Sequence, residues 1–126
     1  MSSMLPNRRA IETVKGFILT DLLKLNVQTI AMDNAAVTLF VPGESSTGTQ
    51  LTANILYVDA ESSGSENLDL PAEADCDGVF LLVVNTGGET INIRNDAAGA
   101  VLTLETANMA VVVCDGTTWR GIVGVP

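Results

Sequence analysis

Glycine-containing turns recur about every ten residues in the C-terminal half of the chain, between short apolar segments. The turns are Thr-Gly-Gly-Glu at 86–89, Asn-Asp-Ala-Ala-Gly at 95–99 and Asp-Gly-Thr-Thr at 115–118. Residues 90–94 alternate polar and apolar side chains, which is the pattern of a strand with one buried face. Short strands between regularly spaced turns are typical of antiparallel sandwiches and barrels. We therefore predict an all-β fold, an antiparallel β-sandwich or barrel, for residues 26–126.

The apolar segments predict the positions of the strands, and the polar segments predict the loops. The expected strands are 36–41, 54–58, 79–84, 90–94, 100–104, 109–114 and 119–123. Glycine and serine are concentrated at 43–50 and 60–67, which we expect to be exposed loops. Gly87-Gly88 has no phosphate-loop frame around it and is predicted to be a hairpin turn. No helix is predicted after residue 25.

The first 25 residues have a different pattern from the rest of the chain. From Ala10 to Leu25 apolar residues recur at steps of three and four, at Ile11, Val14, Ile18, Leu22 and Leu25. This spacing predicts one face of a short helix, although Gly16 and the β-branched residues weaken it and an extended arm is the alternative. We divide the chain into an N-terminal arm, residues 1–25, and a β-domain, residues 26–126.

Charge is divided unevenly between these two parts. Residues 1–24 hold four basic and two acidic side chains, a net charge of +2. Residues 25–126 hold two basic and thirteen acidic side chains, a net charge of −11. A body this acidic repels phosphate backbones, so we expect no nucleic-acid partner. No apolar run approaches the ~18 residues of a membrane span, so we expect no membrane partner. The arm either folds back on its own body or docks on another acidic surface.

The chain offers few residues for catalysis or metal binding. It contains no histidine, the commonest general base and metal ligand. Two carboxylate pairs, Asp59 with Glu61 and Asp75 with Asp77, could act as an acid–base couple or bind a hard cation. Both pairs lie in turn-like segments, where carboxylates commonly serve capping and solubility. We therefore expect no enzyme activity, no cofactor and no bound metal.

Two further residue types point to structural roles. Cys76 and Cys114 have no metal-binding spacing, and we expect both to be reduced thiols, as in a protein made in the cytosol. Cys114 follows three valines and is expected in a strand, whereas Cys76 is expected in a turn. Trp119 is the only tryptophan and is expected in the core or at an interface.

A series of short motifs lies between residues 68 and 123. They are Leu-Pro-Ala at 70–72, Cys-Asp-Gly at 76–78, Asn-Thr-Gly at 85–87, Ile-Asn-Ile at 91–93, Asp-Ala-Ala-Gly at 96–99 and Asp-Gly-Thr-Thr-Trp at 115–119. Together they resemble a β-module of tailed-bacteriophage virion proteins, including head decoration (cement) proteins and tail-fibre domains. The resemblance covers less than half of the chain, and its last motif is the most specific.

The resemblance implies a capsid decoration protein that binds the major capsid protein and stabilises the shell. It implies a protein on the capsid surface of the virion, made in the host cytoplasm and assembled as a homo-oligomer, commonly a trimer. A tail-fibre or receptor- or carbohydrate-binding module is the alternative, although the loops at 43–50 and 60–67 contain no aromatic residue.

Residues of the arm are the ones that we expect to contact the capsid. They are Arg8, Arg9, Ile11, Lys15, Phe17, Ile18, Leu22 and Lys24. A helix that packs on the chain's own sheet is the alternative for the arm, and both can hold for different residues.

Overall fold

The structure is a computed structural model that describes residues 24–124, apart from residue 34 and the ranges 45–46 and 62–65. Most of the helix expected over 10–25 lies outside these residues, and positions 24–26 belong to neither helix nor strand. The described residues contain a single short helical turn, the 3-10 helix η1 (Glu73–Asp75), which the sequence did not predict. Among them, no helix has the length and apolar character needed to cross a membrane.

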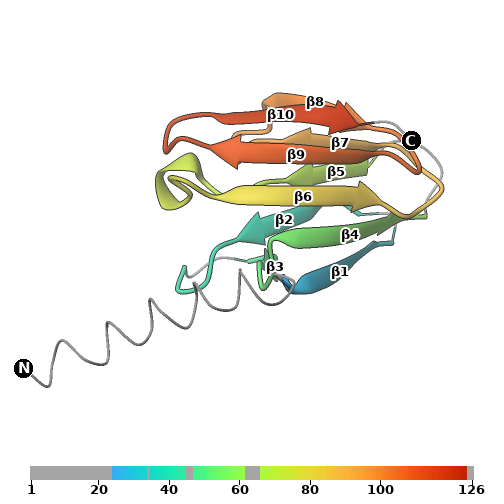
Figure 1. The fold of residues 1–126 in the computed structure, drawn as a ribbon, viewed down its shortest axis with the longest axis horizontal. Coiled ribbons are helices and arrows are strands. Elements are labelled where there is room, and N and C mark those ends of the chain that lie inside the picture. Colours follow the sequence, from blue (N-terminus) through green and yellow to red (C-terminus); the bar gives the residue numbers. More distant parts are fainter. Residues whose placement is uncertain (1–23, 34, 45–46, 62–65, 125–126) are drawn as a thin grey trace, which may run out of the picture.

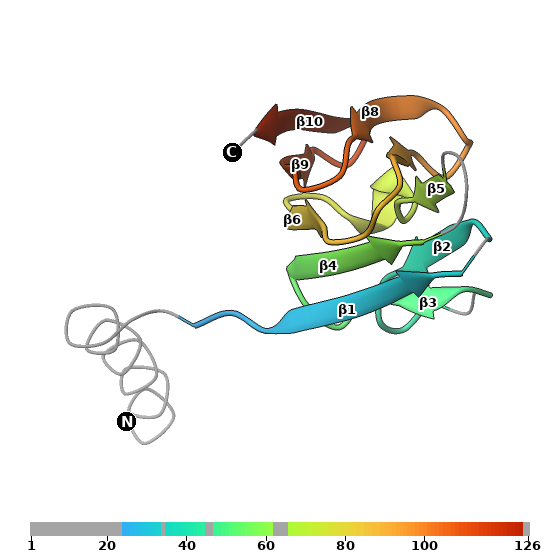
Figure 2. The same ribbon diagram turned by 90° about the vertical axis from the view of Figure 1, so that its right-hand side faces the viewer.

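The described residues form two five-stranded sheets (Figure 1). The first sheet has the order β1 (Val27–Met32), β4 (Ile55–Ala60), β6 (Phe80–Asn85), β9 (Met109–Cys114) and β10 (Trp119–Gly124). The second has the order β3 (Thr49–Gln50), β2 (Val37–Phe40), β5 (Glu66–Asp69), β7 (Ile91–Arg94) and β8 (Ala100–Leu104). Figure 2 shows both sheets running from β1 and β3 at one end to β10 and β8 at the other. The all-β prediction is therefore confirmed.

Both sheets are mixed, so the prediction of a wholly antiparallel fold is wrong. In the first sheet β1, β4 and β6 are parallel, and in the second sheet β3, β2, β5 and β7 are parallel. Antiparallel pairing is confined to β6–β9, β9–β10 and β7–β8. Parallel neighbours need a crossover between them. For β1–β4, β4–β6, β2–β5 and β5–β7 the connection passes through the opposite sheet, whereas β2 and β3 follow each other along the chain in the same sheet.

This arrangement winds the chain into coils. Val27 pairs with Ile55, and Ile55 pairs with Leu82, so the paired residues on successive strands of the first sheet are 28 and then 27 residues apart. Between β1 and β4 the chain passes through β2 and β3 of the second sheet, and between β4 and β6 it passes through β5. The turn at Gly87-Gly88 likewise carries the chain from β6 to β7 in the other sheet. It is not a hairpin turn, because the chain does not reverse within one sheet there.

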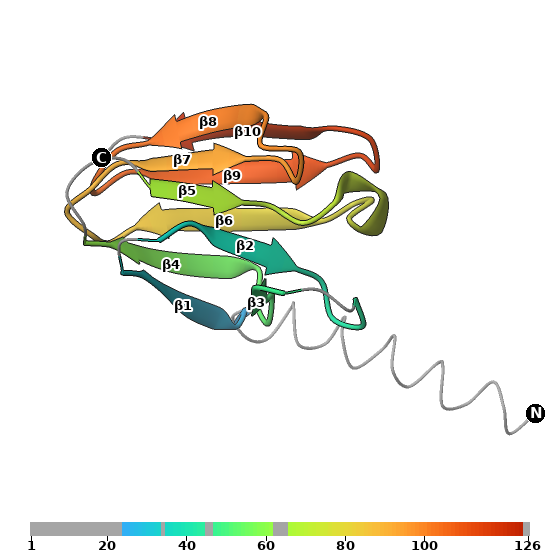
Figure 3. The same cartoon turned by 180° about the vertical axis from the view of Figure 1, so that it is seen from behind.

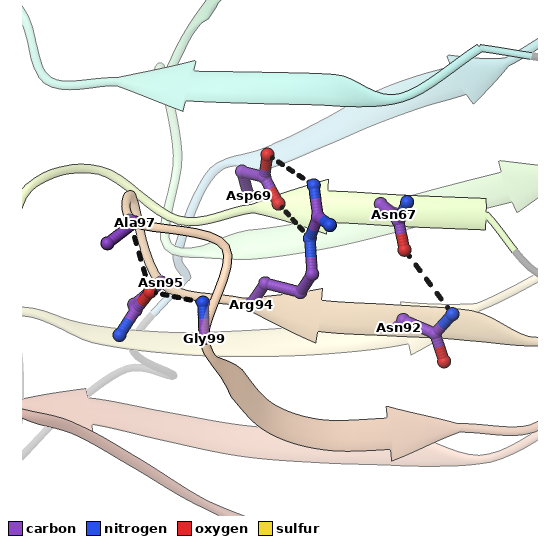
Figure 4. Close-up of polar contacts among 7 residues, drawn as sticks. All are labelled: Asn67, Asp69, Asn92, Arg94, Asn95, Ala97 and Gly99. Carbon is purple, nitrogen blue, oxygen red and sulfur yellow. Dashed lines mark hydrogen bonds and ion pairs between the residues drawn. The ribbon is translucent and has the colours of Figure 1, made fainter.

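The other two glycine turns form the predicted antiparallel hairpins. The Asn95 side-chain oxygen accepts hydrogen bonds from the N–H groups of Ala97 and Gly99, at 3.1 and 2.7 Å (Figure 4). Asp115 Oδ1 accepts from the N–H groups of Thr117 and Thr118, at 2.9 and 2.8 Å. In each turn these bonds fold the chain back on itself. The bonds from the N–H groups of Thr118 and Thr117 also lower the pKa of the Asp115 carboxyl.

One apolar core lies between the sheets. Inward-facing residues alternate with outward-facing ones along the strands, and those of both sheets join one cluster. Its largest fully buried members are Met32, Leu39, Leu56, Leu68, Leu70, Leu81, Ile91, Ile93 and Leu104. The core holds Trp119 as well, in agreement with the sequence.

Two polar side chains cross this core from the first sheet to the second. The amide nitrogen of Asn85, at the end of β6, donates to the Leu104 carbonyl on β8 at 3.1 Å, and its oxygen accepts from the Gly87 N–H at 3.0 Å. Trp119 Nε1 on β10 donates to the carbonyl of Pro71, beyond the end of β5, at 2.9 Å. Buried polar groups are stable only when they are hydrogen-bonded, so these bonds fix how one sheet lies on the other.

The coil geometry predicts that alanine substitutions at two adjacent glycines, Gly87 and Gly88, have unequal effects on stability. A Cβ atom at Gly87 would lie 2.3 Å from the Ala60 backbone nitrogen, whereas a Cβ at Gly88 meets no atom within 4 Å. We expect Gly87→Ala to destabilise the fold by at least ~2 kcal/mol, because neither backbone can move without breaking the crossover. We expect Gly88→Ala to change stability by less than ~0.5 kcal/mol. Urea unfolding of the two variants measures both values, and equal losses would contradict the crossover at this turn.

Candidate functional site

The outward side chains of the first sheet are largely apolar. Strand register places Val27, Ile55, Leu82, Val111 and Ile122 in one row across all five strands. Adjacent rows add Tyr57, Val84 and Met109 on one side, and Phe80 and Val113 on the other. We call these ten residues the apolar face. The first sheet, which carries the apolar face, is the one nearer the viewer in Figure 1.

Several residues of the apolar face are substantially exposed. Ile122 exposes 72% of its surface, Val27 49% and Met109 47%. Single exposed apolar residues are ordinary, but a contiguous patch across a whole sheet marks a surface that contacts another element or molecule. The apolar face is therefore the candidate functional site.

The outer face of the second sheet, nearer the viewer in Figure 3, provides a contrast. Arg94 on β7 forms two bonds with the Asp69 carboxylate on β5, at 2.6 and 2.9 Å, and Asn92 donates to Asn67 at 3.3 Å (Figure 4). The carboxylate also raises the pKa of Arg94. Polar pairs of this kind satisfy one another and suit a surface in contact with water. The two outer faces of the protein are thus chemically different.

Carboxylates lie at one end of the apolar face. Asp59 follows Tyr57 and Val58 on β4, and its Oδ1 atom is buried with no hydrogen-bond partner among the described residues. Glu61 accompanies it, and a hydrogen bond to Asp59 together with repulsion from that carboxyl raises the pKa of Glu61. Glu89 and Asp33 add further negative charge. This end of the face would be stabilised by a nearby cation.

The second carboxylate pair does not form a comparable arrangement. Asp75, at the end of η1, and Asp77 are both exposed, and Asp77 lies beside Gly116 of the last hairpin. Within the described ranges, no three Cys, Asp or Glu side chains gather closely enough to hold a metal ion. From the sequence, both pairs were considered as possible acid–base couples or cation sites. Of the two pairs, only Asp59 and Glu61 are in contact.

Both cysteines are free thiols, as the sequence predicted, and both are buried. Burial raises the pKa of the Cys76 thiol to about 11 and also raises that of Cys114. The two Cys-Asp-Gly segments lie side by side, because the Gly78 N–H donates to the Cys114 carbonyl at 2.9 Å. A buried thiol with a raised pKa forms little thiolate and packs as a small apolar group.

A shallow pocket of about 350 Å³ opens elsewhere, beside β2. Phe40, Pro71 and Asp96 are among its lining residues, together with the exposed Asp75. It is separate from the apolar face, which lies on the other sheet. Its carboxylates give it the same sign of charge as most of the body.

The site residues predicted from the sequence fall mainly outside the described part of the chain. Of the eight, only Lys24 is described; it is exposed and lies three residues before β1. Sequence reasoning missed the apolar face. Its signal was the uninterrupted apolar runs at 79–84 and 109–113, in which outward as well as inward positions are apolar.

Comparisons with known protein families, with curated proteins and with solved structures find no match to this chain. The features from which a function can be inferred are therefore the apolar face, the division of charge and the motifs between residues 68 and 123.

The carboxylate pair predicts a pH-dependent change in stability. A raised pKa means that the folded protein binds the Glu61 proton more tightly than the unfolded chain does. The resulting stability is present below the ordinary glutamate pKa of about 4.3 and is lost as the pH rises through the raised value. We expect Glu61→Gln to melt at a higher temperature than wild type near pH ~7, with a difference that vanishes near pH ~3.5.

Thermal melts across this pH range test the expectation. Glu105→Gln, an exposed glutamate after β8, is the matched control for the change in net charge alone. A Glu61→Gln difference that matches the control at every pH would contradict the coupling with Asp59.

Proposed function

We propose that this chain is a structural protein that attaches to a larger protein assembly, and specifically a capsid decoration protein of a tailed bacteriophage. The motifs between 68 and 123 support the assignment through their resemblance to virion β-modules. In the described structure these motifs lie in turns and strands of the β-domain.

The observation that carries this proposal is the distribution of positive charge. Arg94 pairs with Asp69, and Arg120 pairs with Asp115 at 2.8 Å, so both arginines of the β-domain are bound to carboxylates of the same domain. The other four basic residues of the chain all precede β1. An acidic partner surface is therefore met by the N-terminal segment, and the strongly acidic body faces away from it.

Architecture and assembly complete the proposal. The two sheets act as one sandwich, held together by the shared core and by the Asn85 and Trp119 bonds. Three copies form a trimer on the major capsid protein. Several weak contacts held at high effective concentration bind far more tightly than one contact, which suits a protein that must stay on a shell.

Neutralising the N-terminal arginines is expected to weaken attachment. We expect the Arg8→Gln/Arg9→Gln variant to bind undecorated phage heads at least ~10-fold more weakly at low salt, because two charge contacts with an acidic shell are lost. The loss should shrink as salt is added. Counting copies bound to purified heads of the same virus, as a function of protein concentration, gives the affinity.

Arg120→Gln is the control for loss of a positive charge, because Arg120 lies in the β-domain and pairs with its own hairpin. It should leave binding unchanged. Equal weakening by the control would remove the special role of the N-terminal segment. Absence of saturable binding by the wild-type protein would refute the proposed function itself.

A further inference from the structure

The chain enters the β-domain at the border of the apolar face. Leu25 is 48% exposed and lies two residues before Val27, the first member of the row that crosses all five strands. Positions 24–26 belong to neither helix nor strand, so a turn of the chain there is compatible with β1 as it stands. Residues that precede Lys24 therefore start next to this face.

The dimensions of the face match those of the predicted N-terminal helix. Four strand spacings of ~4.8 Å make the sheet ~19 Å wide, and three two-residue steps from the Phe80 row to the Asp59 row span ~20 Å. A helix over residues 10–23 is ~21 Å long and ~10 Å across. Laid back from Leu25 along β4 and β6, it reaches from one end of the face to the other.

A second copy of the body fits the face less well. The two lengths give a footprint of about 400 Å², whereas a standard stable interface buries ~800 Å² on each partner. Each β-domain also carries a net charge of −11, so two bodies repel, while residues 1–24 carry +2. Size and charge together favour the N-terminal segment over a second body as the occupant.

The sequence pattern of the segment complements the face. At helical spacing Ile11, Val14, Ile18 and Leu22 form one stripe, and Thr13 and Thr20 fall on the opposite side. Lys15 flanks the stripe about ten residues before Leu25, a distance of ~15 Å, and its side chain can extend to the end of the face. Asp59 lies there with its unpartnered buried Oδ1.

We propose that residues 10–23 cover the apolar face of their own chain as an amphipathic helix, with Lys15 paired to Asp59. The stripe residues, among them Ile11, Ile18 and Leu22, are then buried within the protein. Arg8 and Arg9 precede the covered segment and stay available to an outside partner. This inference does not depend on the proposed function, because it concerns the protein alone.

Cross-linking of the full chain tests the contact. Ile18→Cys combined with Tyr57→Cys on β4 should be joined within one chain by a short bismaleimide, at least ~10-fold faster than Ile18→Cys combined with Thr103→Cys. Thr103 is exposed on β8 of the second sheet. The natural cysteines are buried, with raised thiol pKa values, and the single Ile18→Cys variant gives their background.

Mass spectrometry of the linked peptides at low protein concentration separates the outcomes. A link within one chain supports the proposal. A link between two chains would assign the face to a segment of another copy and would overturn it. Equal rates for the Tyr57 and Thr103 pairs would also overturn it, because the segment would then favour neither sheet.

A second measurement leaves the β-domain untouched. If the helix covers the face, Ile18→Asp/Leu22→Asp should release it and raise the fluorescence of a dye for apolar surfaces several-fold. Thr13→Asp/Thr20→Asp adds the same charge on the opposite side of the helix and should leave the fluorescence at the wild-type level. Circular dichroism confirms that both variants keep the sheets. The same fluorescence from both variants would contradict the proposal. The measurement requires no capsid.

Discussion

Every strand of this protein depends on burying its inward face against the opposite sheet. Successive coils contribute strands to both sheets, so neither sheet can form its apolar interior without the other. The Asn85 and Trp119 bonds act within this shared core and set the position of one sheet on the other. A core of this kind favours concerted folding, because a strand of one sheet leaves its apolar inward side chains exposed until the opposite sheet covers them.

With the inward faces committed, the outward faces are free to differ. On the second sheet, Asp69 and Arg94 and the paired asparagines satisfy one another in contact with water. On the first sheet, apolar side chains occupy the corresponding positions. The same backbone architecture therefore presents one face suited to solvent and one suited to a partner. Together with the excess of basic residues before β1, this asymmetry makes the two sides of the molecule chemically distinct.

Local structure was predictable from the sequence, and long-range pairing was not. The hairpins at 95–99 and 115–118 follow from Asn95 and Asp115, whose side chains bind backbone N–H groups within a few residues. The parallel pairing of Val27 with Ile55 depends on partners that no local signal identifies, so β1 was missed and the Gly87 turn was misread as a hairpin. The apolar face was hidden for a similar reason. The sequence of a strand that is apolar on both sides does not indicate whether its second side is buried in a core or exposed at the surface.

The parallel coils end at β1, whose outer edge has no paired strand among the described residues. A coil of 27 or 28 residues contributes strands to both sheets, as β4 and β5 do, and has its own share of the interior. Gene duplication of such a unit could extend the stack without disturbing the antiparallel strands that close the other end. The length of the β-domain along the stack can therefore change in whole increments while the closing hairpin of β9 and β10 stays the same.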